Sequence, residues 1–141
     1  MKTTQVKTTM IAPCGMNCSI CRLQFRSPKE CDGCNSGSRN LPLYCFNCIM
    51  RNCTLRVKGN GRYCFQCDTF PCARLKRLDK RYRNKYGMSM LENLRNIKEM
   101  GIRKFVSNEK KRWACSKCGK LLCVHGKECG FCGAKRKVKN F

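Results

Sequence analysis

The chain has 141 residues, of which 31 are basic and 8 acidic, and its formal net charge is +23. Its 16 cysteines are far more than a domain of this length ordinarily contains. Because it has no long apolar run and its first ten residues lack the apolar segment of a secretory signal, we expect a cytoplasmic protein without a membrane span. A basic, cysteine-rich chain of this kind argues against a membrane protein and points to metal ions and polyanions as partners.

Most of the cysteines occur in pairs separated by two residues. This spacing directs two thiolates at one tetrahedral metal ion, whereas a disulfide framework would require secretion. We therefore interpret the cysteines as metal ligands rather than disulfide partners. The pairs are Cys18/Cys21, Cys31/Cys34, Cys45/Cys48, Cys64/Cys67, Cys115/Cys118 and Cys129/Cys132.

Residues 1–72 are predicted to form a cysteine-rich module that binds several zinc ions. Eleven of the sixteen cysteines lie between residues 14 and 72, and long apolar stretches are few. We expect loops and short hairpins with little hydrophobic core, in which metal–thiolate bonds replace apolar burial. The metal ligands expected here are Cys14, Cys18, Cys21, Cys31, Cys34, Cys48, Cys53, Cys64, Cys67 and Cys72.

The grouping of these ligands stays open. Cys18/Cys21 with Cys31/Cys34 can form one four-sulfur site, with Cys14 serving a neighbouring site or packing. Either a second site uses Cys48, Cys53, Cys64 and Cys67 while Cys14 and Cys72 help to build another, or bridging thiolates form a two-metal cluster. Cys45 is the candidate for a spare cysteine, because eleven is not divisible by four.

The stretch "PCGMNCSIC" also raises the alternative of an iron–sulfur cluster. Its CxxxCxxC pattern, Cys14, Cys18 and Cys21, holds such clusters in radical enzymes. Those enzymes need a large barrel and a glycine-rich cosubstrate site, which 141 residues cannot supply. Zinc is therefore the preferred metal, with three to four ions in the whole chain, and an iron–sulfur or redox protein remains an alternative.

Residues 73–113 have a helical pattern. Apolar residues recur at steps of three and four from Leu75 to Tyr86 and predict a helix that ends at Gly87. Ser89 to Glu92 form a capping box that begins a second helix, ended by Gly101. The apolar residues from Ile102 to Trp113 suggest a third, shorter helix, weakened in its middle by Ser107 and Asn108.

Residues 114–134, "ACSKCGKLLCVHGKECGFCGA", predict a zinc ribbon with an extended central stretch. Cys115, Cys118, Cys129 and Cys132 fill all four coordination positions, and Gly119 and Gly133 follow where a positive φ angle is useful. Cys123 is interpreted as a packed strand residue, and His125 as a surface group or a neighbour of the ligands. The basic tail, residues 135–141, is expected to be unpacked.

The cysteine pattern resembles an uncharacterised, cysteine-rich family of unknown function that often ends in a zinc ribbon. The similar stretches are "PCGMNCSIC", "CDGC", "CIMRNC", "YCFQCDTFPCARLKR" and "KRWACSKCGKLLCVHGKECGFCG", from Ala12 to Gly133. The resemblance implies a cytoplasmic, prokaryotic type of metal-binding protein, presumed to bind zinc, and implies no activity. The ten cysteines named above match the family's recurring positions, while Cys45 looks extra.

Basic residues are densest in the helical segment. Arg74, Arg77, Arg81 and Lys85 are spaced three or four residues apart, so they share one helix face that could contact several phosphates. Each four-thiolate zinc site carries about −2, and three to four sites would leave a net charge of about +15 to +17. Aromatic residues beside the cysteines could stack on bases, but core packing is the favoured interpretation; they are Tyr44, Phe46, Tyr63, Phe65 and Phe70.

The expected fold is a small, metal-stabilised α+β protein with an irregular cysteine-rich module, central helices and a C-terminal zinc ribbon. The expected function is structural zinc binding, with RNA or DNA contacted through the basic helical face. A protein–protein adaptor is the alternative. We expect no enzymatic activity, because no pair of residues suited to nucleophilic catalysis is evident, and no small-molecule substrate.

Overall fold

The computed structural model describes residues 6–22, 25, 48, 52–59 and 61–138. The expected ligands Cys31 and Cys34 lie outside the described residues, as do Cys45, Tyr44 and Phe46. The description therefore covers the start and end of the cysteine-rich module, the helical segment and the C-terminal cysteines.

Among the described residues, three longer helices form the body: α3 (Ala73–Tyr86), α4 (Met90–Met100) and α5 (Ile102–Arg112). The first ends as predicted at Gly87, whose φ of 64° is left-handed, and the second begins at Ser89, whose hydroxyl accepts a hydrogen bond from the Glu92 N–H. The third runs without a break through Ser107 and Asn108 and is as long as α4. The predicted third helix is confirmed and is shorter than α3, and burial of Phe105 and Val106 outweighs the weak propensity of its middle.

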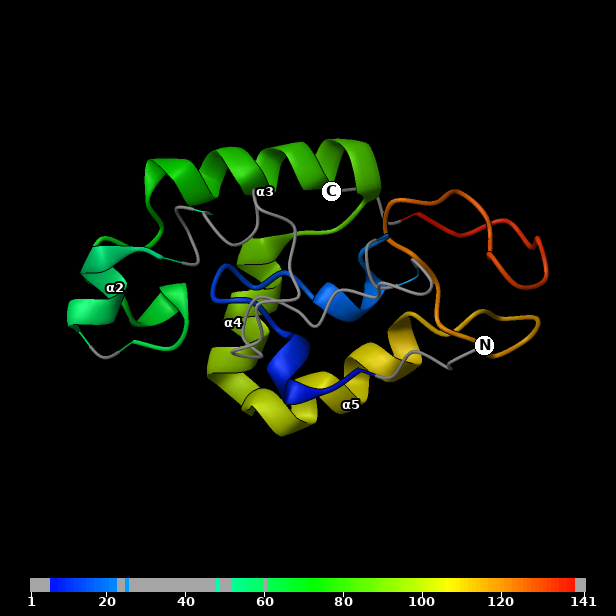
Figure 1. Cartoon of the computed structure of the whole chain (residues 1–141), viewed down its shortest axis with the longest axis horizontal. Coiled ribbons are helices and arrows are strands. Elements are labelled where there is room, and N and C mark those ends of the chain that lie inside the picture. The colour runs from blue at the N-terminus through cyan, green and yellow to red at the C-terminus, as the bar shows by residue number, and fades with distance from the viewer. Residues whose placement is uncertain (1–5, 23–24, 26–47, 49–51, 60, 139–141) are drawn as a thin grey trace.

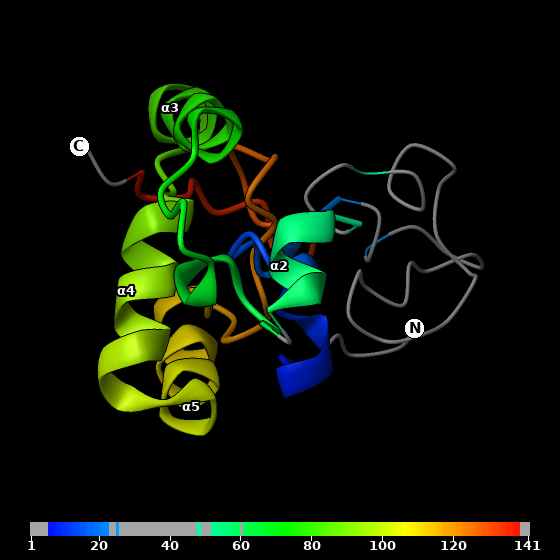
Figure 2. The ribbon, with the colours of Figure 1, turned by 90° about the vertical axis from the view of Figure 1, so that its left-hand side faces the viewer.

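Short helical turns precede these helices. They are the 3-10 turns η1 (Thr8–Met10), η2 (Cys18–Ile20) and η3 (Cys64–Gln66) and the five-residue helix α2 (Thr54–Lys58). In Figure 1, α3 lies along one edge, α2 lies below its start, and the residues after α5 form loops at the opposite end. Figure 2 shows α4 between α3 and α5, and α4 contacts both of them.

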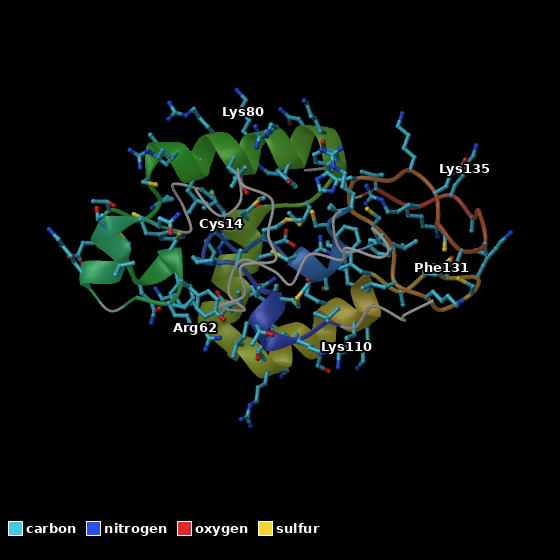
Figure 3. The ribbon with its side chains drawn as sticks, in the orientation of Figure 1. Cys14, Arg62, Lys80, Lys110, Phe131 and Lys135 are labelled. Atoms are coloured by element: carbon cyan, nitrogen blue, oxygen red, sulfur yellow. The ribbon has the colours of Figure 1, made fainter. Side chains whose placement is uncertain are left out.

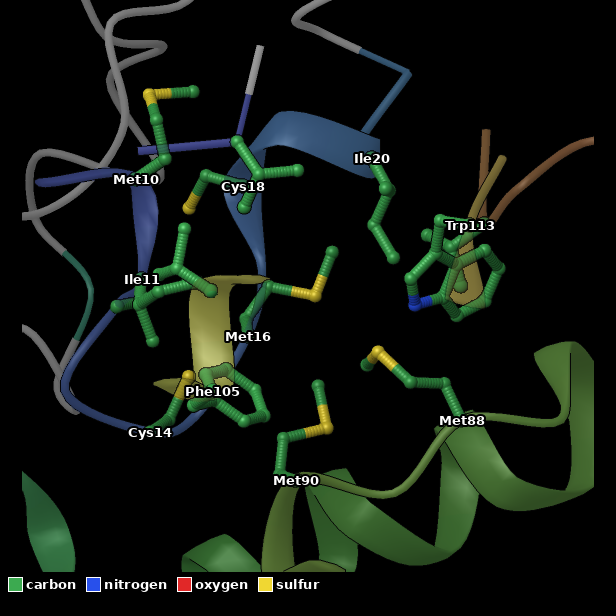
Figure 4. Close-up of a cluster of buried hydrophobic side chains, with 14 of the residues drawn as sticks. Met10, Ile11, Cys14, Met16, Cys18, Ile20, Met88, Met90, Phe105 and Trp113 are labelled. Carbon is green, nitrogen blue, oxygen red and sulfur yellow. The ribbon is translucent and has the colours of Figure 1, made fainter. Parts of the chain in front are cut away.

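The N-terminal segment, residues 10–20, lies inside the molecule. Residues 10 to 20 are all buried, and Ile11 and Ile20 are completely inaccessible. The side chain of Met16, in this segment, lies close to those of Met88, in the α3–α4 connection, and Met90, the first residue of α4 (Figure 4). Residues of the cysteine-rich module, the helices and the C-terminal loops therefore share one hydrophobic core.

This core corrects the expectation that residues 14–72 contribute little apolar packing. Met16, Ile20, Tyr63 and Cys64 are all buried in it. Tyr63 also stacks on Phe65 at 5.8 Å, and Phe65 and Phe70 pack against the core, which confirms their interpretation as packing residues. Flexible methionines fill the irregular space between short, cysteine-containing turns and the helices, which explains how a segment without regular periodicity is buried.

A buried carboxylate fixes the angle between α3 and α4. Asp79 is 2% exposed, and its oxygens accept hydrogen bonds from the Ser89 hydroxyl at 2.6 Å, the Leu91 N–H at 3.1 Å and the Arg83 guanidinium at 2.7 Å. The negative charge therefore lies at the N-terminus of α4, where the helix dipole stabilises it. The helix pair is thereby joined by one polar centre as well as by apolar packing.

The expected β content is not confirmed. Within the described part of the chain, β pairing is limited to isolated bridges, Ile11 with Asn17, Ala114 with Leu121, and Glu128 with Lys135. Two of these bridges close the loops that carry the C-terminal cysteines. None of the helices in the described ranges is both long and apolar enough to cross a membrane.

Candidate metal centre

Four C-terminal cysteines converge on one point. The sulfur atoms of Cys115, Cys118, Cys129 and Cys132 all lie within 4.8 Å of one another. Cys115 Sγ is 3.6 Å from Cys132 Sγ, and Cys118 Sγ is 3.6 Å from Cys129 Sγ. A metal ion with four sulfur ligands at 2.3 Å requires neighbouring sulfurs about 3.8 Å apart, so this arrangement is that of a tetrahedral thiolate site.

Two similar turns hold the four thiols in place. In the first, the Gly119 N–H donates to Cys115 O at 2.9 Å and the Cys115 N–H donates to Lys120 O at 2.8 Å. In the second, the Gly133 N–H donates to Cys129 O at 2.9 Å and the Cys129 N–H donates to Ala134 O at 2.7 Å. The glycines have φ angles of 75° and 77°, as their position after the second cysteine of each pair predicted.

Backbone donors face the first sulfur of each turn. N–H groups of Cys118 and Lys117 lower the pKa of the Cys115 thiol to about 6, and those of Cys132 and Phe131 lower the pKa of Cys129. Hydrogen bonds to a sulfur anion favour the thiolate, which is the form that binds metal. The turns therefore favour the thiolate at two of the four ligands. At Cys118, the lowering by the Lys120 N–H is outweighed by desolvation and by the neighbouring thiols, which raise its pKa to about 11.

The donor set fits a thiophilic metal ion. Four sulfur ligands in tetrahedral geometry suit zinc or iron and are poor ligands for magnesium or calcium. Cys115 and Cys129 are buried, whereas Cys118 and Cys132 are exposed, so the site lies at the surface with one side covered by the protein. These four predicted ligands are brought together by the structure.

His125 joins this C-terminal segment to α3, a role that the sequence did not indicate. Its Nδ1 accepts a hydrogen bond from the Arg22 N–H at 3.3 Å, and its Nε2 is 3.2 Å from the Tyr82 hydroxyl. Its ring also meets those of Tyr82 and Tyr86 edge-on, at 5.8 and 4.8 Å. Burial, followed by the charges of Arg22 and Arg136, lowers the pKa of His125, so the neutral ring is the form that packs here.

Arg136 is a second connection, and it corrects the prediction that residues 135–141 are unpacked. Its guanidinium donates to the carbonyl oxygens of Gly126 at 2.9 Å, Val124 at 3.0 Å and Tyr86 at 3.1 Å, and it lies 5.3 Å from the centre of the Trp113 ring. One side chain thus connects the cysteine loops to the last turn of α3. No local pattern indicates this contact, because Arg136 and Tyr86 are 50 positions apart.

Cys123 lies between the two cysteine turns without joining their cluster. It is half-buried, and burial raises the pKa of its thiol, which disfavours the metal-binding thiolate. Its neighbour Val124 is fully buried and donates its N–H to Ile20 O at 2.8 Å. Cys123 itself lies outside the β bridges and the hydrophobic core of the described residues, so its interpretation as a packed strand residue is not confirmed.

The N-terminal cysteines are placed differently. Cys14, Cys18 and Cys64 are buried, while Cys21, Cys48, Cys53, Cys67 and Cys72 are partly exposed. No disulfide joins any of the thirteen cysteines within the described ranges. Over the same ranges, no three of these N-terminal thiols approach one another as closely as the C-terminal four do. Whether they bind metal stays a prediction, which for Cys31 and Cys34 concerns residues outside the described ones.

The predicted basic face is present on α3. Arg74, Arg77, Arg81 and Lys85 are all exposed. Arg81 lies 5.9 Å from the centre of the Tyr82 ring, whereas Arg83 is held by Asp79 and does not share this face. Figure 3 shows Lys80 pointing away from the molecule on this side and Lys110 on the opposite side.

The comparisons with known proteins give one match. A family model described as "Protein of unknown function (DUF3795)" matches residues 10–77, which contain the N-terminal cysteines and the start of α3. Searches of the curated proteins and of the solved structures returned no match. The chain is therefore similar, over residues 10–77, to a family whose function is unknown, and the C-terminal cysteine cluster lies outside the matched segment.

Proposed function

We propose that this protein is a non-enzymatic zinc protein that contacts RNA or DNA through the basic face of α3. The proposal of metal binding rests on one observation, the convergence of four sulfur atoms within 4.8 Å of one another, those of Cys115, Cys118, Cys129 and Cys132. Because all four tetrahedral positions are filled by the protein, the metal has no open position for a substrate and serves the fold. Zinc is proposed over iron because a single ion between four thiolates at a surface site requires no redox chemistry.

The basic surface supports the second half of the proposal. A cavity of about 460 Å³ lies between the end of α3 and the C-terminal loops. Its lining includes Lys85 of the α3 face together with Lys127 and Lys135 of the loops. Positive charge thus continues from the helix to the loops around the metal centre. Surface lysines and arginines in this arrangement attract phosphates without reading base sequence.

Binding should be measured by fluorescence anisotropy with single-stranded RNA, single-stranded DNA and duplex DNA of equal length, over a series of salt concentrations. The test variant carries Arg81→Glu and Lys85→Glu on α3. The control carries Lys110→Glu and Lys111→Glu on α5, which are also exposed and change the net charge equally. Two lost phosphate contacts should reduce the slope of log affinity against log salt by about 1.8 for duplex DNA, or about 1.4 for single strands.

The proposal predicts that the α3 variant loses affinity and salt dependence while the control keeps most of both. Equal losses in the two variants would show that only the net charge matters and would contradict a binding face on α3. Absence of binding even at low salt would remove the nucleic-acid proposal and favour the protein–protein adaptor.

A further inference from the structure

A second group of cysteines surrounds a cavity at the opposite end of the molecule from the C-terminal cluster. The cavity has a volume of about 400 Å³ and lies where α2 and η3 meet the start of α3. Its lining includes four cysteine side chains, the apolar residues Phe70 and Leu75, and two arginines. The four are Cys53, Cys64, Cys67 and Cys72.

The backbone fixes each of these cysteines at a turn or a helix end. Cys64 and Cys67 bound the turn η3, in which the Cys67 N–H donates to Cys64 O at 3.1 Å, and the Cys64 N–H is anchored to Pro13 O at 2.9 Å. The side chain of Gln66 closes the same turn by accepting from the Tyr63 N–H at 3.0 Å. A C-x2-C pair on a tight turn is also how the C-terminal cluster presents its thiols.

The other two cysteines immediately precede helices. Cys72 is the N-cap of α3, and its carbonyl accepts from the Lys76 N–H at 3.0 Å. Cys53 precedes α2, and its carbonyl accepts from the Val57 N–H at 3.1 Å. Both positions are therefore set by helix geometry rather than by the thiols themselves. The positive end of α3 lies at Cys72 and favours negative charge there.

The polar surroundings suit a negatively charged centre. A divalent ion bound by four thiolates carries a net charge of −2, and the two arginines that line the cavity, Arg74 and Arg77, carry +2 together. In addition, Thr69 Oγ1 lies 3.2 Å from Cys67 Sγ and can donate a hydrogen bond to a metal-bound sulfur. Contacts of this kind around metal ligands hold their orientation and raise metal affinity.

We infer that Cys53, Cys64, Cys67 and Cys72 form a second thiolate-ligated metal centre at the start of α3, with Arg74 and Arg77 offsetting its charge. The inference deepens the proposed metal-dependent function by naming one ligand set within the N-terminal module. It also divides the basic face of α3, because Arg74 and Arg77 serve the metal whereas Arg81 and Lys85 remain available to phosphates.

The occupant is a thiophilic metal, either one zinc ion or an iron–sulfur cluster. The four sulfurs do not converge as those of the C-terminal cluster do, and they line a cavity larger than a single ion needs. Their side chains must therefore turn inward to bind zinc, whereas a four-iron cluster would place each sulfur on a different iron. Metal analysis of anaerobically purified protein distinguishes a zinc ion from an iron–sulfur cluster. A colourless protein with zinc alone indicates the ion, and a brown protein with iron and acid-labile sulfide indicates the cluster.

The site is tested by loading the full chain with cadmium-113 and recording its NMR spectrum, because each four-thiolate site gives a separate signal. The Cys67→Ser/Cys72→Ser variant should lose one equivalent of metal and one signal, while the signal of the C-terminal cluster persists. The Cys118→Ser/Cys132→Ser variant should lose the other signal, and Cys123→Ser should lose neither. Retention of every signal in Cys67→Ser/Cys72→Ser would overturn the inference.

A second variant keeps all ligands and therefore avoids a general loss of folding. Arg74→Gln/Arg77→Gln should release metal from this centre to a chelator about tenfold faster, with the C-terminal release rate unchanged. Equal release rates from wild type and variant would overturn the role of the arginines. Loss of the C-terminal signal from wild type would count against the proposed zinc ribbon instead, so the two proposals fail by different observations.

Discussion

Arg136 provides the sharpest prediction about how the C-terminal metal loops are held against the helices. Replacing it with alanine removes three guanidinium hydrogen bonds, to the carbonyls of Gly126, Val124 and Tyr86, and the contact with Trp113. Hydrogen bonds from charged groups contribute about 1.5–3 kcal/mol each, and we take the lower end because Arg136 is only half-buried. Three such bonds at that lower end sum to about 4.5 kcal/mol, and solvent screening of a half-exposed side chain reduces the expected loss in free energy of unfolding to about 2–4 kcal/mol.

The assay is urea unfolding with metal held in excess, so that changes in metal affinity do not enter the comparison. Lys137→Ala is the control, since Lys137 is exposed and such a change shifts stability by about 0.5 kcal/mol or less. Arg136→Lys should fall between the two, because an ammonium keeps the charge but cannot reach three carbonyls. If Arg136→Ala is no less stable than Lys137→Ala, the loops are held by other contacts and the reasoning is refuted.

Further changes test the core and its buried acids. In Gly15→Ala, the new Cβ would lie 2.8 Å from Met90 O at a residue whose φ is 91°, so we expect the free energy of unfolding to fall by about 2–4 kcal/mol. In Gly119→Ala, where φ is 75° and the space is open, it should fall by only about 1–2 kcal/mol. Equal losses in the two variants would contradict the close packing at Gly15. In Asp79→Asn, the buried hydrogen-bonded charge is lost, and urea unfolding should show a loss of about 2–4 kcal/mol; an unchanged midpoint would show that this polar centre does not hold α3 to α4. Burial raises the pKa of Glu109, so the native protein holds this proton more tightly than the unfolded chain does. The protonated carboxyl therefore stabilises the fold at low pH, and this stabilisation is lost as the pH rises above the usual carboxyl range toward the folded pKa. Glu109→Gln should remove that decline as the pH rises above about 4, and an unaltered pH profile would disprove the assignment.

The helices were predictable because their signals are local. Apolar spacing, the Ser89 cap and the glycines at positions 87 and 101 lie within or next to the segments they define. The C-terminal cluster was predictable for the same reason, since two C-x2-C pairs with following glycines specify two turns and four ligands. In both cases, the residues that decide the structure are neighbours in sequence.

The docking of these parts was not predictable, because it depends on contacts between distant positions. Asn17 and Glu109 are 92 residues apart and share a buried hydrogen bond of 3.4 Å, and Tyr82 meets His125 over 43 positions. The burial of residues 10–20 was missed because this short segment, MIAPCGMNCSI, has neither helical nor strand periodicity. Its buried polar side chains, Asn17 and Ser19, are satisfied by each other and by Glu109 on α5.

The central claim, that Cys115, Cys118, Cys129 and Cys132 bind one metal ion, is tested most directly by alkylating the zinc-loaded chain and locating modified cysteines by mass spectrometry. Cys118 and Cys132 are exposed, so only a bound metal can protect their sulfurs from the reagent. The account predicts that all four cysteines are protected together and become reactive together when a chelator removes the zinc. Rapid modification of Cys118 and Cys132 in the presence of excess zinc would contradict it.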